Sequence, residues 1–145
     1  MQSKRFNLRV YGLLIWNNRI LVSDEWIGEH QFTKFPGGGL EWGEGLEECV
    51  KREFLEEIGL EIEADGLYYV TDFFQVSAFR PNDQIVSFYY KVSSSSPDKI
   101  AVRHSKFDFG EDKLVFRWVN LSDLNPEEFR FPIDRIVVQK LIDSL

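Results

Sequence analysis

The stretch that decides the fold is residues 36–60, which read PGGGLEWGEGLEECVKREFLEEIGL. A proline and three glycines stand directly before a segment with helical periodicity. This segment predicts a helix over residues 46–58, because one apolar residue recurs at every fourth position. These residues are Leu46, Val50, Phe54 and Ile58. Gly59 is suited to the left-handed conformation that ends helices. The pattern therefore predicts a glycine turn joined to an amphipathic helix.

The face of this helix opposite the apolar stripe carries three carboxylates. Glu53, Glu56 and Glu57 stand at i, i+3 and i+4, so they project from one face within a few ångströms of one another. Like charges at this spacing cost about 0.2–0.5 kcal/mol per pair, so helix stability does not explain the cluster. Clustered carboxylates suit Mg²⁺ or Mn²⁺, which also bind phosphate oxygens of a substrate. We therefore predict a metal site, and the alternative is a solvated acidic helix face.

The spacing of the polar residues in this stretch follows a longer pattern. From Gly38 to Leu60 the chain reads G-x5-E-x7-REF-x-EE-x-GL. This pattern resembles the signature box of the Nudix hydrolases, MutT-like enzymes that cleave nucleoside diphosphates linked to another moiety. Phe54 stands where the family more often has an aliphatic residue, and it keeps the apolar character. The resemblance implies a metal-dependent pyrophosphohydrolase with an α/β/α sandwich fold around a mixed β-sheet.

The resemblance also implies a metal-binding and catalytic role for residues of the box. Glu53, Glu56 and Glu57 are expected to bind Mg²⁺ or Mn²⁺ and to take part in catalysis, and a carbonyl of the glycine turn, at Gly37, is expected to join them. Arg52 is expected to organise the carboxylates. Helical spacing alone already places Arg52 within reach of Glu56.

Four further acidic residues are candidates for the site. Glu44 precedes the helix, where it either favours the positive end of the helix dipole or takes part in catalysis. The general base is either a glutamate of the box or an acid on a later loop, where Glu111 and Asp112 are the candidates and Glu111 is the first of them. Asp134 lies near the start of the last helix, where family members that hydrolyse nucleoside triphosphates have a polar contact to the base.

The rest of the chain predicts strands on both sides of this unit. Strands are expected at residues 6–16, 19–23, 67–79, 85–93 and 114–119, with one short strand toward Phe35. Residues 24–34 are expected to be mainly a loop, and the three glycines are expected to break regular structure. A final helix is expected over residues 132–145, with a buried side of Ile133, Ile136, Val137, Leu141 and Ile142. Two helices and about six strands predict a mixed sheet with a helix on each face.

Composition limits the kind of protein. A chain of 145 residues fits one domain, residues 1–145. Residues 41–63 hold nine glutamates against Lys51 and Arg52, which accounts for the whole net charge of −7 and argues against a basic nucleic-acid-binding face. Cys49 is the only cysteine, so an internal disulfide is excluded. With no apolar leader or membrane-spanning run, a cytoplasmic protein that does not bind membranes is expected.

Two functional hypotheses follow. The first is an enzyme acting on a small-molecule nucleotide, of the nucleoside triphosphate, nucleotide sugar or ADP-ribose type. The alternative is a non-catalytic Nudix domain that senses a nucleotide. Because the chain keeps every glutamate of the box, the enzyme is favoured. A homodimer is a further expectation, since many family members dimerise.

Overall fold

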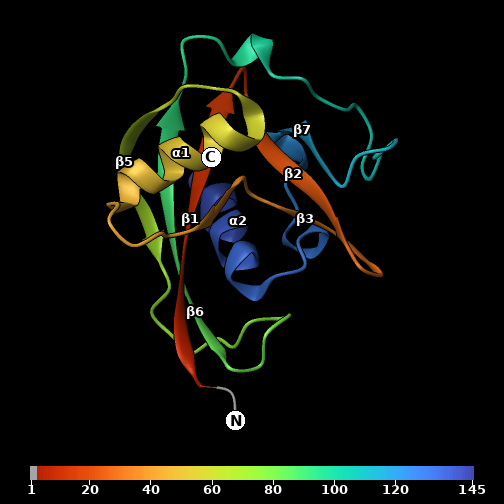
Figure 1. Ribbon diagram of the computed structural model, residues 1–145. Helices are drawn as coiled ribbons and strands as arrows, with labels where there is room; N and C mark the ends of the chain where they lie inside the picture. The colour runs from red at the N-terminus through yellow and green to blue at the C-terminus, as the bar shows by residue number, and fades with distance from the viewer. Residues whose placement is uncertain (1–2) are drawn as a thin grey trace.

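The computed structural model describes residues 3–145 (Figure 1). Met1 and Gln2, which the expected domain 1–145 included, lie outside the described residues. The elements are β1 (Arg5–Trp16), β2 (Arg19–Ile27), β3 (His30–Lys34), β4 (Gly37–Gly39), α1 (Leu46–Ile58), β5 (Glu63–Val70), β6 (Asp83–Ser93), β7 (Leu114–Asn120) and α2 (Pro132–Asp143), with short 3-10 turns at Pro97–Lys99, Leu121–Asp123 and Pro126–Glu128.

The strands form one mixed sheet. β1 and β2 are antiparallel and are joined by Asn17 and Asn18, which have φ values of 52° and 58°. Positive φ at both central residues is what a tight hairpin of this kind requires, and asparagine tolerates it. β1 runs parallel to β6, and the strand order is β3-β2-β1-β6-β5, with β4 on β1 and β7 on β2. The strands expected at residues 6–16 and 19–23 therefore pair as a hairpin.

The two helices lie on opposite faces of this sheet (Figure 1). Neighbouring strand residues point to opposite faces, so Leu13 and Leu14 of β1 enter different cores. Leu14 belongs to the buried cluster that contains Val50 of α1, whereas Leu13 belongs to the cluster that contains Val137 of α2. The predicted α/β/α sandwich with a mixed sheet is confirmed.

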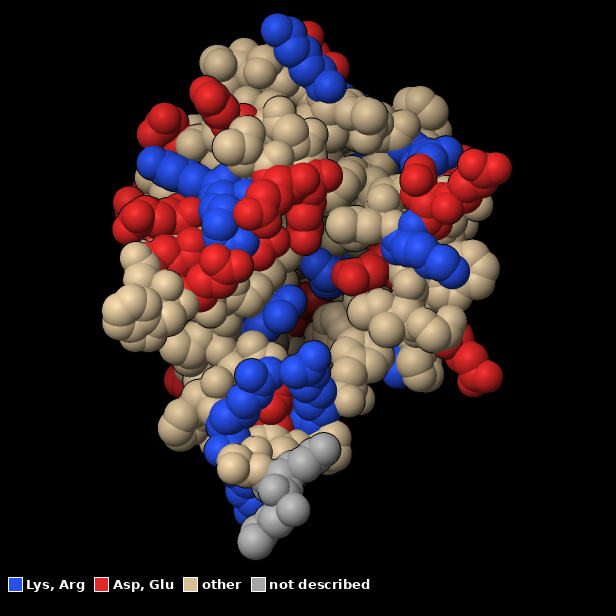
Figure 2. All heavy atoms as spheres, viewed as in Figure 1, with Lys and Arg blue, Asp and Glu red and all other residues tan. Residues whose placement is uncertain are grey.

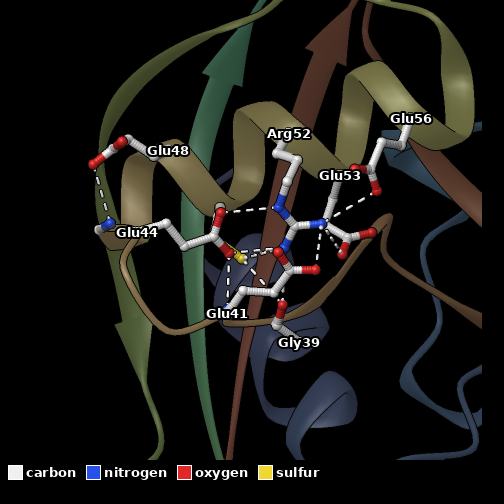
Figure 3. A network of polar contacts seen from close by, with 9 residues as sticks. Gly39, Glu41, Glu44, Glu48, Arg52, Glu53 and Glu56 are labelled. Carbon is white, nitrogen blue, oxygen red and sulfur yellow. Dashed lines mark hydrogen bonds and ion pairs between the residues drawn. The ribbon is translucent and has the colours of Figure 1, made fainter.

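Helix α1 has the bounds that the apolar stripe predicts. Gly59 ends it in the left-handed conformation, with φ 74°, and its N–H donates to the Leu55 carbonyl at 3.0 Å. At the other end Gly45 has no side chain to cap the helix. The Glu48 carboxylate instead accepts a hydrogen bond from the Gly45 N–H at 3.1 Å, which holds the first turn (Figure 3).

The three glycines differ from expectation. They were expected to break regular structure, but Gly37–Gly39 form β4, which pairs antiparallel with residues 9–11 of β1. Residues 24–34 also differ, because β2 continues to Ile27 and β3 follows after a turn at residues 28–29. Strand pairing with β1, β2 and β7 supplies the backbone hydrogen bonds that local sequence alone does not indicate.

One further strand boundary and the buried side of the last helix differ from expectation. The strand expected at residues 67–79 is β5, which begins at Glu63 and ends at Val70. Beyond β5, the Ser77 hydroxyl accepts hydrogen bonds from the N–H groups of Phe79 and Arg80. This local turn competes with the backbone hydrogen bonds of strand pairing. In α2, Ile136 is partly exposed and Val138 is buried instead.

Neither helix of the described chain is long and apolar enough to cross a membrane.

Candidate active site

An arginine in the middle of α1 organises the acidic residues around it (Figure 3). Arg52 Nη2 and Nε donate to the two Glu44 carboxylate oxygens at 2.7 and 2.9 Å. Its Nη1 donates to Glu53 Oε1 at 3.0 Å and to Glu56 Oε2 at 3.2 Å. Nη2 also donates to the Gly39 carbonyl at 3.1 Å. One guanidinium therefore fixes three carboxylates and ties α1 to β4.

Glu44 is the strongest partner of this arginine. Its side chain is 13% exposed, and its carboxylate also accepts the Glu41 N–H at 2.9 Å. The hydrogen bonds from Arg52 are the main reason that the pKa of Glu44 is lowered to about 2, and the Glu41 N–H acts in the same direction against the effect of burial. Glu44 thus stays ionised and holds Arg52 in place, a contact that neither sequence interpretation of Glu44 included.

The glycines of β4 leave room for the site. A Cβ on Gly37 would lie 2.1 Å from the Val10 carbonyl oxygen, and Gly37 has φ 151°, a conformation that side chains rarely adopt. A Cβ on Gly38 would lie 2.5 Å from the carboxyl group of Glu53. Gly37 therefore allows β4 to pair closely with β1, and Gly38 leaves the space that the Glu53 carboxylate occupies.

Glu57 lies one helical turn after Glu53, and the two carboxyl groups interact. The residue as a whole is exposed, but the surrounding protein desolvates its carboxyl group. This desolvation is the main reason that the pKa of Glu57 is raised to about 7. Repulsion from Glu53 adds to the effect, whereas Lys34 opposes it. The face of α1 that the sequence identifies thus brings together two acids that resist being ionised at the same time.

A cavity of about 630 Å³ opens beside these acids. Its floor is the outer half of β1, where Arg5, Asn7, Arg9 and Tyr11 alternate along one face of the strand. Glu53 of α1 also lines the cavity. Figure 2 shows this hollow between the acidic surface over α1 and a basic rim farther down. A cleft lined by both signs of charge and reaching the α1 carboxylates suits a polar, anionic ligand.

The sequence of residues 6–141 matches the NUDIX domain family model. The chain belongs to the Nudix family. Family membership makes it a hydrolase acting on acid anhydrides, in a family that acts on small nucleotides and generally uses divalent metals.

Solved Nudix structures share the fold. The MutT NUDIX hydrolase from Burkholderia pseudomallei is 21% identical, with a TM-score of 0.67, and the match covers 92% of this chain and 96% of that one. The MutT protein from Methanosarcina mazei is 15% identical, with a TM-score of 0.71, and the match covers 99% and 98%. At this level of identity the likeness concerns the fold.

The donor set of this Nudix chain suits a divalent cation. Among residues 3–145 no three acidic, histidine or cysteine side chains already stand together as a cation site. Glu56 is held by Arg52, while Glu53 and Glu57 interact directly. With a pKa of about 7, Glu57 is partly protonated near neutral pH, and a divalent ion would replace that proton. The carboxylates therefore fit a hard cation.

Asp134 lines the same cavity but is buried, with 3% of its surface exposed. The Tyr89 hydroxyl donates to its Oδ1 at 2.5 Å. Burial raises the pKa of Asp134 to about 6, and the Tyr89 hydrogen bond and the charges of Lys34 and Arg9 oppose this rise. Asp134 thus lies at the α2 wall of the cavity. The Tyr89 hydroxyl already uses part of its capacity to accept hydrogen bonds.

Glu111 is not brought to the cavity. It is exposed in the loop before β7 and does not line the cavity described above. Its neighbour Asp112 accepts a hydrogen bond from Arg103 at 2.8 Å and lines a second cavity of about 450 Å³ together with Glu57. That Glu111 acts as the base remains a prediction.

Sequence reasoning missed three cavity residues, Arg9, Tyr11 and Lys34. Arg9 Nε donates to the Tyr11 hydroxyl at 3.0 Å, and the Lys34 ammonium lies 3.5 Å from a Glu25 carboxylate oxygen. The signal for the first two was present, because polar residues at alternate positions of the first strand face one side. For Lys34 no such signal exists.

Proposed function

We propose that this Nudix hydrolase cleaves the pyrophosphate bond of a nucleoside diphosphate linked to another moiety. One observation carries the proposal. Arg52 orients the α1 carboxylates, and one of them, Glu53, also lines a cavity large enough for a nucleotide. A solvated acidic helix face would have neither the central arginine nor the adjoining cavity.

Glu53, Glu56 and Glu57, with the Gly37 carbonyl, are the residues that would hold Mg²⁺ or Mn²⁺. When bound, such ions neutralise pyrophosphate charge and lower the pKa of water. In the chain itself Arg52 keeps Glu53 and Glu56 on the side of α1 that faces the substrate. Arg52 does so as a positioning residue, because its own donors are already used by the surrounding carboxylates and the Gly39 carbonyl.

The proton of the attacking water needs an acceptor next to the cavity. Glu53 lines the cavity, and Glu57, one helical turn away, has a pKa of about 7, near the pH at which such an acceptor works best. Attack on one phosphorus would release a nucleoside monophosphate and a phosphorylated remainder. Glu111 is the second candidate, and Glu111→Gln tests it.

The far wall of the cavity offers apolar surface for the nucleotide. The Phe32 ring centroid lies 5.0 Å from that of Phe131 and 5.7 Å from that of Phe79. All three rings line the cavity, and flat aromatic surface of this kind stacks on a base. Asp134 lies beside them as a polar contact.

The test is incubation with Mg²⁺ or Mn²⁺ and a panel of nucleoside triphosphates, nucleotide sugars, ADP-ribose and dinucleoside polyphosphates. We expect a nucleoside monophosphate from at least one class and loss of that product in Glu56→Gln. Binding of a nucleotide without any release of monophosphate or pyrophosphate would instead support a sensor. Light scattering after size-exclusion chromatography tests the expected homodimer.

A further inference from the structure

Arg9 is a half-buried cation without a carboxylate at ion-pair distance among the described residues, although Glu53 and Glu25 act on its charge from farther away. Within residues 3–145 its side chain donates one hydrogen bond, from Nε to the neutral Tyr11 hydroxyl at 3.0 Å. Its guanidinium carbon also lies 5.8 Å from the centre of the Tyr11 ring, which fixes the orientation of the group. No ion pair is formed by Arg9 anywhere in the described chain, so both Nη groups remain available to a ligand in the cavity that Arg9 lines.

Three other cations line the cavity, and one of them, Arg80, is exposed, so water already solvates its charge. Arg5 makes a bidentate ion pair with the buried Asp83, at 2.8 and 3.0 Å. Lys34 lies 3.5 Å from a Glu25 carboxylate oxygen. A charge that is partly removed from water without a paired partner is costly, and charge-assisted bonds to an anion remove that cost. Arg9 is therefore the cavity cation that a ligand would satisfy.

The position of Arg9 relative to the carboxylates follows from β4. Successive residues of a strand present opposite faces. The Glu53 carboxyl packs over Gly38, whereas the Arg9 guanidinium lies over Gly39, with Nη1 3.6 Å from the position of a Cβ there. The acidic group and the cation thus lie over neighbouring glycines on opposite faces of β4, and both line the cavity. A substrate whose pyrophosphate lies at the carboxylates would therefore meet Arg9 with a neighbouring group.

We propose that Arg9 binds a negatively charged group on the moiety beyond the pyrophosphate, so that the enzyme prefers substrates whose second moiety is itself anionic. This inference rests on the proposed hydrolysis of nucleoside diphosphates. The Nη groups of Arg9 donate to a carboxylate or phosphate of that moiety, and Tyr11 holds the guanidinium in the required orientation. A substrate of the same shape with a neutral moiety leaves the cation unpaired.

UDP-glucose and UDP-glucuronate form a matched pair of probes, because they differ only by a hydroxymethyl group in place of a carboxylate. The constant for hydrolysis to UMP and sugar 1-phosphate, kcat/KM, is measured for both, together with the dissociation constants in Ca²⁺ or without metal. We expect UDP-glucuronate to be favoured by roughly 10- to 100-fold, the range for a charged hydrogen bond, mainly through KM.

Substitutions then separate Arg9 from the fold. Arg9→Met should remove the preference, and Arg9→Lys should restore part of it by keeping the charge. Arg19→Met is the matched control, because Arg19 is also half-buried and lies over the Trp16 and Trp118 rings outside the cavity. This control should keep the preference.

Each outcome is decisive. Equal affinity for both probes, including no binding of either, overturns the inference. An equal loss of affinity for both probes in Arg9→Met also overturns it, because it would show that Arg9 binds the part of the ligand that the two probes share. Preferential binding of UDP-glucuronate through Arg9, with no release of monophosphate from it or from any nucleotide of the panel, would uphold the anion site and refute the proposed hydrolysis. Hydrolysis of both probes at equal efficiency would support the proposed hydrolysis and refute the anion site.

Discussion

Neighbouring glycines of β4 should respond differently to the same substitution, and this contrast tests the geometry of the site. In Gly38→Ala the three atoms nearest to the new Cβ all belong to the Glu53 carboxyl, at 2.5–2.8 Å. Ordinary contact begins at 3.4 Å, so the carboxyl must move by about 1 Å. Because that group is the flexible end of a side chain, we expect a change in unfolding free energy within about 1 kcal/mol. A misplacement of about 1 Å at a reacting centre costs roughly 100-fold in rate, and we expect this loss in kcat/KM.

In Gly37→Ala the obstacle is backbone. The Cβ would lie 2.1 Å from the Val10 carbonyl oxygen, and the φ of 151° is strained for alanine. Strain of about 1–3 kcal/mol and overpacking of about 1–3 kcal/mol both act, so we expect a loss of about 3 kcal/mol or more in unfolding free energy. Urea unfolding and kcat/KM at matched Mg²⁺ concentration measure both variants. If Gly38→Ala unfolds as easily as Gly37→Ala, or keeps wild-type turnover, the assigned packing of Glu53 over Gly38 is wrong.

Three further substitutions test individual acids. Glu57→Gln should lower turnover by about 100-fold or more, since a positioned base contributes at least that much. Its unfolding free energy without metal at pH 8 should stay equal or rise by up to about 0.5 kcal/mol, because repulsion from Glu53 is relieved. Wild-type turnover at a matched metal concentration would contradict this prediction. Glu44→Gln should lower kcat by about tenfold, because Arg52 loses its charged partner, and an unchanged pH–rate profile and kcat would show that Glu44 does not position Arg52. Asp134 has a pKa of about 6 in the folded protein against 3.8, so the folded state binds its proton more tightly and stability falls as pH rises from about 4 to 6. Urea unfolding should show this fall, at most about 3 kcal/mol, in the wild type relative to Asp134→Asn, and parallel pH curves for the two proteins would refute it.

The box and its helix were the most predictable part of this protein. The stripe of α1 and the glycine that ends it depend on local spacing, and local spacing is visible in one sequence. The ends of β2 and β5 were less predictable, because each is set by pairing with a distant strand. Residues 24–27 contain two acids and a tryptophan, yet they form strand because β3 and β7 pair with β2 on both sides.

The site shows the same division between local and distant contacts. The pair of Arg52 and Glu56 follows from helical spacing, but the contact of Arg52 with Glu44 spans eight residues and a loop, and only the fold reveals it. This contact also explains how a helix carries so many like charges. Arg52 bonds Glu44, Glu53 and Glu56 at once, so the repulsion that remains is concentrated on Glu57, whose pKa is raised as a result of its desolvation and of Glu53. On a solvated acidic helix face the repulsion would be distributed evenly among the carboxylates. Here it falls mainly on the pair of Glu53 and Glu57 beside a cavity, where a bound cation would relieve it.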